Sequence, residues 1–171
     1  GEPWHILGLR VDWSADAVVL TTRMAAIDVS TALPASSAGR LVFDVYVDIN
    51  HVPAAGSSAL LDGRGAFTAN RDCWEYVLSM GPSGAALLRA IPESAPAVLT
   101  SIPVSVNPAL KTIRAAVPRT LLRGNPLRWG YIAAAFTAQS GPSRAEGPAA
   151  VLPGGPLGIL APLEQQQELS A

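Results

Sequence analysis

Alternation of apolar and polar residues with a period of two is the feature that most constrains this fold. In its clearest stretch, Phe43, Val45 and Val47 take one parity, and the residues between them, Asp44 and Tyr46, take the other. Successive side chains of a strand point to opposite faces, so this pattern indicates half-buried strands. Strands are expected at 7–13, 18–24, 41–49, 74–80, 85–90, 100–106, 111–117 and 129–138. Gly, Pro, Asn and Asp separate them, which predicts an all-β, antiparallel β-sandwich.

Parity also predicts the core. Residues of one parity in each strand should line the space between two sheets, because a slip of one residue would turn the whole set to water. The expected core residues are Leu9, Val11, Trp13, Leu20, Phe43, Val45, Val47, Trp74, Tyr76, Leu78, Trp129 and Tyr131. Tyr46 has the opposite parity, so it is expected on a solvated sheet face with Asp44 and Asp48.

Length and composition bound the organisation of the chain. Its 171 residues suit one domain, which we expect to be a sandwich module over 1–141. The Pro/Gly-rich segment 142–171 is expected to be an irregular tail packed on the same domain, held by Leu160 and Leu163. No apolar run reaches the roughly 18 to 20 residues of a membrane-spanning helix. The abrupt, strand-like start suggests a module or processed segment of a longer protein.

Charge and cysteine content exclude several partners and sites. The net charge of −1, from 12 basic and 13 acidic residues, argues against a nucleic-acid partner, since such domains usually carry a basic stripe. The single cysteine, Cys73, excludes an internal disulfide and a thiolate metal cluster.

No motif for catalysis or for a resident cofactor is found. The phosphate-cradling, dinucleotide-binding and nucleophile-elbow patterns are absent, and the two histidines, His5 and His51, fit no catalytic order. We therefore expect no enzyme activity, no cofactor and no metal. Two alternatives stay open. Calcium could bind oxygens of residues near 44–62, namely Asp44, Asp48, Asn50 and Asp62. Haem could be held by axial ligands chosen from Met24, Met80, His5, His51 and Lys111.

Three successive sequence stretches resemble a known family. They are 43–58 (FDVYVDINHVPAAGSS), 60–67 (LLDGRGAF) and 72–78 (DCWEYVL). Shorter stretches, at 104–108, 129–131 and 158–162, follow in the expected order. Together they resemble the C-terminal module of glucodextranase and related amylolytic enzymes, which belongs to the DOMON-like group of immunoglobulin-like β-sandwiches.

The resemblance implies a non-catalytic accessory module that binds polysaccharide or a cell-envelope glycan. Such a module would be secreted or attached to the cell envelope, in a longer parent chain with covalently linked catalytic domains. The residues that match the family's motifs and could bind the ligand are Asp44, Tyr46, Asp48, Asn50, Arg64 and Glu75. There are two alternatives. One is a haem-binding electron-transfer domain of the DOMON type, and the other is a structural spacer without a ligand.

The long connection 50–72 should be ordered, because it ends where a core strand begins. Arg64 is its expected anchor, since a guanidinium offers five donors in a rigid fork. Asp48 is the first choice of partner because it lies at the other end of the loop. The remaining candidate partners are Asp62, Asp72 and Glu75.

Overall fold

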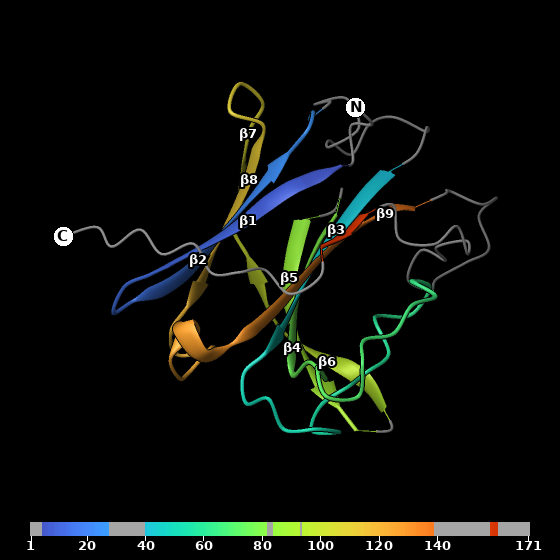
Figure 1. Ribbon diagram of the computed structural model, residues 1–171. Coiled ribbons are helices and arrows are strands. Elements are labelled where there is room, and N and C mark those ends of the chain that lie inside the picture. Colours follow the sequence, from blue (N-terminus) through green and yellow to red (C-terminus); the bar gives the residue numbers. More distant parts are fainter. Residues whose placement is uncertain (1–4, 28–39, 82–83, 93, 139–157, 161–171) are drawn as a thin grey trace.

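The computed structural model contains two antiparallel sheets that pack face to face (Figure 1). It describes residues 5–27, 40–81, 84–92, 94–138 and 158–160. The predicted all-β, antiparallel sandwich is confirmed. Within the described ranges, helical structure is confined to one 3-10 turn, η1 (Pro126–Arg128), and no helix has the length and hydropathy needed to cross a lipid bilayer.

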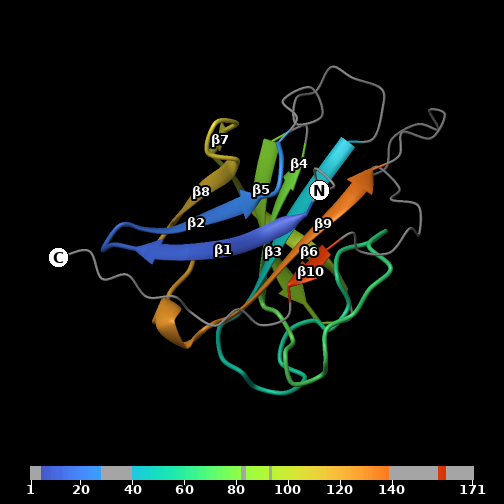
Figure 2. The ribbon, with the colours of Figure 1, turned by 45° about the horizontal axis from the view of Figure 1, so that its top comes forward.

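The smaller sheet has four strands in the order β1-β2-β8-β7 (Figure 2). The strands are β1 (Ile6–Trp13), β2 (Ala17–Met24), β8 (Thr112–Pro118) and β7 (Val104–Asn107). β1 and β2 are joined as an antiparallel hairpin. Its turn is fixed by Ser14, whose Oγ accepts hydrogen bonds from the amides of Asp16 and Ala17, each 3.2 Å long.

The larger sheet has six strands in the order β10-β9-β3-β4-β5-β6. The strands are β10 (Gly158–Leu160), β9 (Gly130–Ala138), β3 (Arg40–Asp48), β4 (Tyr76–Gly81), β5 (Gly84–Ile91) and β6 (Ser94–Ile102). β10 pairs with Ala133–Ala135 at the edge of the sheet. This strand is the described part of the expected tail; the boundary expected at 141, and Leu163, lie outside the described residues.

One predicted strand is two strands in the structure. Alternation placed a single strand at 100–106, but β6 ends at Ile102 and pairs with β5, whereas β7 begins at Val104 and pairs with β8. Pro103 lies between them, where the chain passes from one sheet to the other. Proline has no N–H to donate to a ladder, so a crossing between sheets suits it better than a strand interior.

The main core fills the space between the sheets, and most of the predicted core residues lie there. Seven of them are buried in it: Leu20, Phe43, Val45, Val47, Leu78, Trp129 and Tyr131. Leu9, Val11 and Tyr76 pack against it and are partly buried. Trp13 was expected in this core but is 40% exposed, because it is the last residue of an edge strand, next to the hairpin turn.

Trp74 is buried on the other side of the larger sheet, which corrects its assignment to the core between the sheets. It belongs to a second cluster with Tyr46, Leu60, Val77, Ala134 and Phe136. β4 begins only at Tyr76, and the backbone of Trp74 pairs instead with Ser57. Strand parity therefore does not extend back to Trp74.

The segment 49–75, here called the covering loop, lies over the outer face of the larger sheet and completes the second cluster. Figure 1 shows it in teal and green beside β4 and β6. The face that alternation predicted to be solvated is therefore buried around Tyr46, which is 1% exposed, and Asp44, which is 0% exposed. Leu60 of the loop supplies part of this cover.

Two phenylalanines test the placement of the main core. Phe43 is 1% exposed and Phe67, at the surface of the covering loop, is 76% exposed. Phe43→Ala should lower the free energy of unfolding by about 3 to 5 kcal/mol, because it leaves a cavity in a packed core. Phe67→Ala is the control and should change it by less than about 0.5 kcal/mol. Urea unfolding measures both, and equal losses would contradict this placement.

Candidate functional site

Hydrogen bonds to Asp48 and Glu75 hold the first residues of the covering loop. Asp48 Oδ1 accepts the amides of Asn50 (3.1 Å) and His51 (2.7 Å). Glu75 Oε2 accepts the amide of Ile49 at 2.8 Å, and its Oε1 accepts Asn50 Nδ2 at 2.6 Å. Of the predicted site residues, Glu75 and Asn50 thus tie the first residues of the loop to its last, and Asp48 fixes the turn where the loop begins.

His51 links this turn to the segment before β9. Its Nδ1 lies 3.2 Å from Asp48 Oδ2, and its Nε2 lies 2.7 Å from the carbonyl oxygen of Arg128. The backbone of His51 has a φ of 53°, in the left-handed region that side chains other than Gly seldom adopt. The ring contacts on both sides hold this conformation in place.

A buried ion pair fastens the middle of the loop to the sheet. Arg64 Nε donates to Asp44 Oδ2 at 2.6 Å, and its Nη2 lies 3.4 Å from Oδ1. The exposed fractions of the two side chains are 8% and 0%. The guanidinium carbon also lies 5.1 Å from the centre of the Phe136 ring, a cation–π geometry.

Tyr46 joins this pair and extends it to the loop backbone. Its hydroxyl donates to Asp44 Oδ2 at 3.0 Å and accepts the amide of Leu61 at 3.2 Å. Arg64 is thus the anchor that the sequence predicted, but the choice of Asp48 as partner was wrong. Both aspartates share the parity of Tyr46, but Asp44 lies beneath the middle of the loop, whereas Asp48 caps the turn where the loop begins.

Burial and the charge of Asp44 shift the pKa values of Tyr46 and Arg64. Burial, followed by the negative charge of Asp44, raises the pKa of Tyr46 well above its ordinary value, so its hydroxyl stays neutral and can donate. Burial alone would lower the pKa of Arg64, but the hydrogen bond and charge of Asp44 raise it above the ordinary value. At the loop ends, burial raises the pKa of Glu75, against the hydrogen bond from the Ile49 amide.

Trp74 connects the loop to the second cluster. Its Nε1 donates to the carbonyl oxygen of Ala59 at 2.9 Å, and its ring meets Tyr46 edge-on at 5.2 Å between centroids. Its backbone exchanges two hydrogen bonds of 2.9 Å with Ser57. An indole with a satisfied N–H and an aromatic neighbour is a rigid support for the residues above it.

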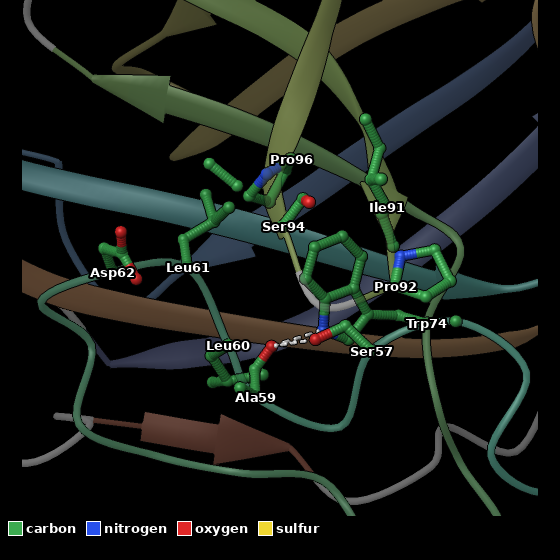
Figure 3. Close-up of a pocket in the computed structure, with 13 residues that line it drawn as sticks. Ser57, Ala59, Leu60, Leu61, Asp62, Trp74, Ile91, Pro92, Ser94 and Pro96 are labelled. Carbon is green, nitrogen blue, oxygen red and sulfur yellow. Dashed lines mark hydrogen bonds between the residues drawn. The ribbon is translucent and has the colours of Figure 1, made fainter.

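A cavity of about 420 Å³ opens between the covering loop and the turn that joins β5 to β6. We call it the loop cavity; Figure 3 shows the residues that line it. Its apolar wall includes Leu61, Ile91, Pro92 and Pro96, and its polar groups include Ser57, Asp62 and Ser94. Trp74 borders it but is only 1% exposed, so a ligand could touch little of the indole ring.

The six residues predicted to bind a ligand fall into two groups, and none of them lines the loop cavity. Asp44, Tyr46 and Arg64 lie beneath the covering loop, and Asp48, Asn50 and Glu75 tie its ends. In this structure they position the loop, and a direct contact with a ligand stays a prediction. Tyr46 and Asp48 also border a small hollow of about 70 Å³.

Sequence reasoning missed the β5–β6 side of the loop cavity. The residues there are Ile91, Pro92, Ser94, Ala95 and Pro96. They carry no period-two pattern, since two prolines interrupt the stretch. Paired prolines around a short turn are the one signal that could have marked a fixed, solvent-facing wall.

The candidate calcium ligands form no metal-binding cluster among the described residues, and two of the candidate haem ligands lie in the core. Asp44 is paired with Arg64, and Asp62 is exposed on the loop. Over the described ranges, no group of three or more His, Cys, Asp or Glu side chains is arranged to hold a metal ion. Met24 and Met80 are both buried in the main core, as expected of Met that fills a core.

Comparison with family models found no match, and a search of curated proteins found none either. The resemblance to the glucodextranase module, with its immunoglobulin-like and DOMON-like character, therefore stays a prediction from the sequence stretches between 43 and 162.

The buried ion pair gives the sharpest stability prediction for this site. Arg64→Met should lower the free energy of unfolding by about 3 to 5 kcal/mol, because Asp44 would be left buried without its counter-charge. Arg71→Met is the matched control. Arg71 pairs with Asp72 at 3.3 Å, but its side chain is 82% exposed. Water already screens this pair, so Arg71→Met should change the free energy of unfolding only slightly.

Urea unfolding of both variants measures these losses. The double variant Asp44→Asn/Arg64→Met should recover part of the loss, since the stranded charge is removed. Equal small losses for Arg64→Met and Arg71→Met would show that the Arg64 pair is not buried in solution.

Two loop glycines test how closely the loop packs on Trp74. Both have positive φ, 99° at Gly56 and 60° at Gly65. A Cβ on Gly56 would overlap the carbonyl of Trp74, whereas a Cβ on Gly65 would meet no atom within 4 Å. Gly65→Ala should therefore cost about 1 to 2 kcal/mol, the left-handed penalty alone, and Gly56→Ala about 3 kcal/mol or more.

Thermal and urea unfolding compare the two alanine variants. A loop that packs loosely on Trp74 would give the same cost at both positions, which would contradict the observed contact.

Proposed function

We propose that this domain is a non-catalytic carbohydrate-binding accessory module and that a glycan binds in the loop cavity. The observation that carries the proposal is an open cavity of about 420 Å³, one wall of which is a loop anchored by a buried ion pair. Its volume falls within the range of small-ligand sites. A wall already fixed before binding lowers the entropic cost of association.

The chemistry of the lining suits a neutral sugar. Leu61, Ile91 and Pro96 offer an apolar wall to the C–H face of a pyranose ring, and Asp62 and Ser94 offer acceptors and a donor to its hydroxyls. Because Trp74 is almost fully enclosed, no broad aromatic platform is offered. Affinity should accordingly be modest, as for a shallow site with few immobilised contacts.

The lining supports binding rather than hydrolysis. Among the described residues that line the cavity, Asp62 is the one carboxylate, whereas glycoside hydrolysis generally uses two carboxyl groups that face each other across the bond. The proposal places the domain outside the cell or on its envelope, within a longer chain that carries catalytic domains. Here the support is the resemblance of 43–78 to modules of that kind.

Filling the cavity tests the proposal. Ala95 is exposed on the cavity wall, so Ala95→Trp should occupy the space without disturbing the core. Ala109→Trp, at an exposed position between β7 and β8, is the control. Affinity electrophoresis in gels containing dextran, starch or cell-wall polysaccharide, with a glycan array, should show retention of the wild type and of the control. Ala95→Trp should lose at least about ten-fold in affinity.

Two outcomes would overturn the proposal. The wild type could show no retention on any of these glycans, or Ala95→Trp could bind as well as Ala109→Trp. The second result would place the glycan elsewhere on the domain.

A further inference from the structure

The outer face of the four-stranded sheet concentrates positive charge. Parity along β1, β2 and β8 turns Arg10, Arg23 and Arg114 away from the main core, and all three are exposed. Hydroxyl and amide side chains of Thr21, Thr112, Ser105 and Asn107 occupy the same face. We call these seven residues the basic face.

Strand register brings the three arginines around one residue. Thr21 pairs with Arg10 on one side and with Arg114 on the other. Arg23 is two residues further along β2 and points to the same face, so it is a diagonal neighbour of both. Because β2 separates β1 from β8, Arg10 and Arg114 lie about 10 Å apart at their backbones, twice the strand spacing.

One of the three positive charges on this face is offset, because Arg10 pairs with Asp12. Within the described part of the chain, Arg23 and Arg114 form no ion pair, and Asp12 is the one acidic side chain on the outer face. Arg10 Nε contacts both carboxylate oxygens of Asp12, at 2.9 and 3.0 Å. Most described acidic residues lie instead between Asp44 and Glu75, in the larger sheet and its covering loop. Among the described residues, the acidic side chains are therefore concentrated away from the basic face.

We propose that the basic face binds an acidic polysaccharide, at a site separate from the loop cavity. A guanidinium donates two parallel hydrogen bonds to a carboxylate or sulfate group. On an open face each such contact contributes little by itself, because water and salt screen it. A polymer that repeats its negative charges can engage several arginines together, and multivalent engagement raises the affinity well above that of one contact.

The polar neighbours favour a glycan over a nucleic acid. Thr21, Thr112 and Ser105 offer hydroxyls and Asn107 offers an amide, which suit sugar hydroxyls. Sites for single-stranded nucleic acids combine a basic groove with aromatic rings on which the bases stack. The basic face, as described, contains no aromatic side chain.

Retention on immobilised dextran sulfate and polygalacturonate tests the proposal, with uncharged dextran as reference. The wild type should be retained on both acidic polymers at low ionic strength and should elute as salt is raised. Arg23→Ser/Arg114→Ser should weaken binding about ten-fold or more. Arg89→Ser/Arg123→Ser removes the same charge from exposed positions outside the basic face and should change binding less than about two-fold.

Unchanged melting temperatures establish that both double variants are folded. The proposal is overturned if the wild type passes through both acidic columns at low salt, or if the two double variants lose binding equally. Tighter, salt-dependent binding of single-stranded DNA than of dextran sulfate would overturn the assignment to a glycan. Ala95→Trp should keep its binding to dextran sulfate, so failure of the loop cavity and failure of the basic face are separable.

Discussion

The buried contact between Arg64 and Asp44 is the interaction on which the covering loop depends. Long connections normally run over the surface of a domain in contact with water, but this one presses on a sheet face and encloses Trp74, Tyr46 and Phe136. A carboxylate so deeply buried is costly unless a counter-charge and hydrogen bonds compensate it. Arg64 and Tyr46 provide both, so the loop and the sheet face require each other.

This arrangement gives the domain two apolar clusters with different roles. The main core joins the two sheets and sets the sandwich. The second cluster joins the larger sheet to the covering loop, which forms one wall of the loop cavity. The proposed glycan site is thus built on a segment fixed by tertiary contacts, and the basic face lies on the other sheet, outside both clusters.

The sequence predicted what depends on local periodicity. Alternation located most strands and the parity of Phe43, Val45 and Val47. It also predicted that Arg64 anchors the loop. It could not identify Asp44 as the partner, because parity alone makes that face look solvated and the cover comes from residues distant in sequence.

Other features left weaker signals or none. Trp74 precedes its strand and pairs with Ser57, so extrapolated parity put it on the wrong side of the sheet. The chain passes from one sheet to the other at Pro103. Pairing with strands distant in sequence determines this change of sheet, and the proline is compatible with it but does not specify it. The β5–β6 wall of the loop cavity has no periodic pattern, and its place opposite the covering loop follows from the order of strands in the sheet.

Native-state amide hydrogen exchange tests most directly whether the covering loop is fixed on the sheet. The amides of Ser57, Leu60 and Trp74 donate backbone hydrogen bonds of 2.9 to 3.0 Å within the loop. We predict that they exchange nearly as slowly as the amides of β3 and β4, because the loop should open only when the sheet beneath it unfolds. Exchange of these three amides at the rate of a free peptide, with β3 and β4 still protected, would contradict this account.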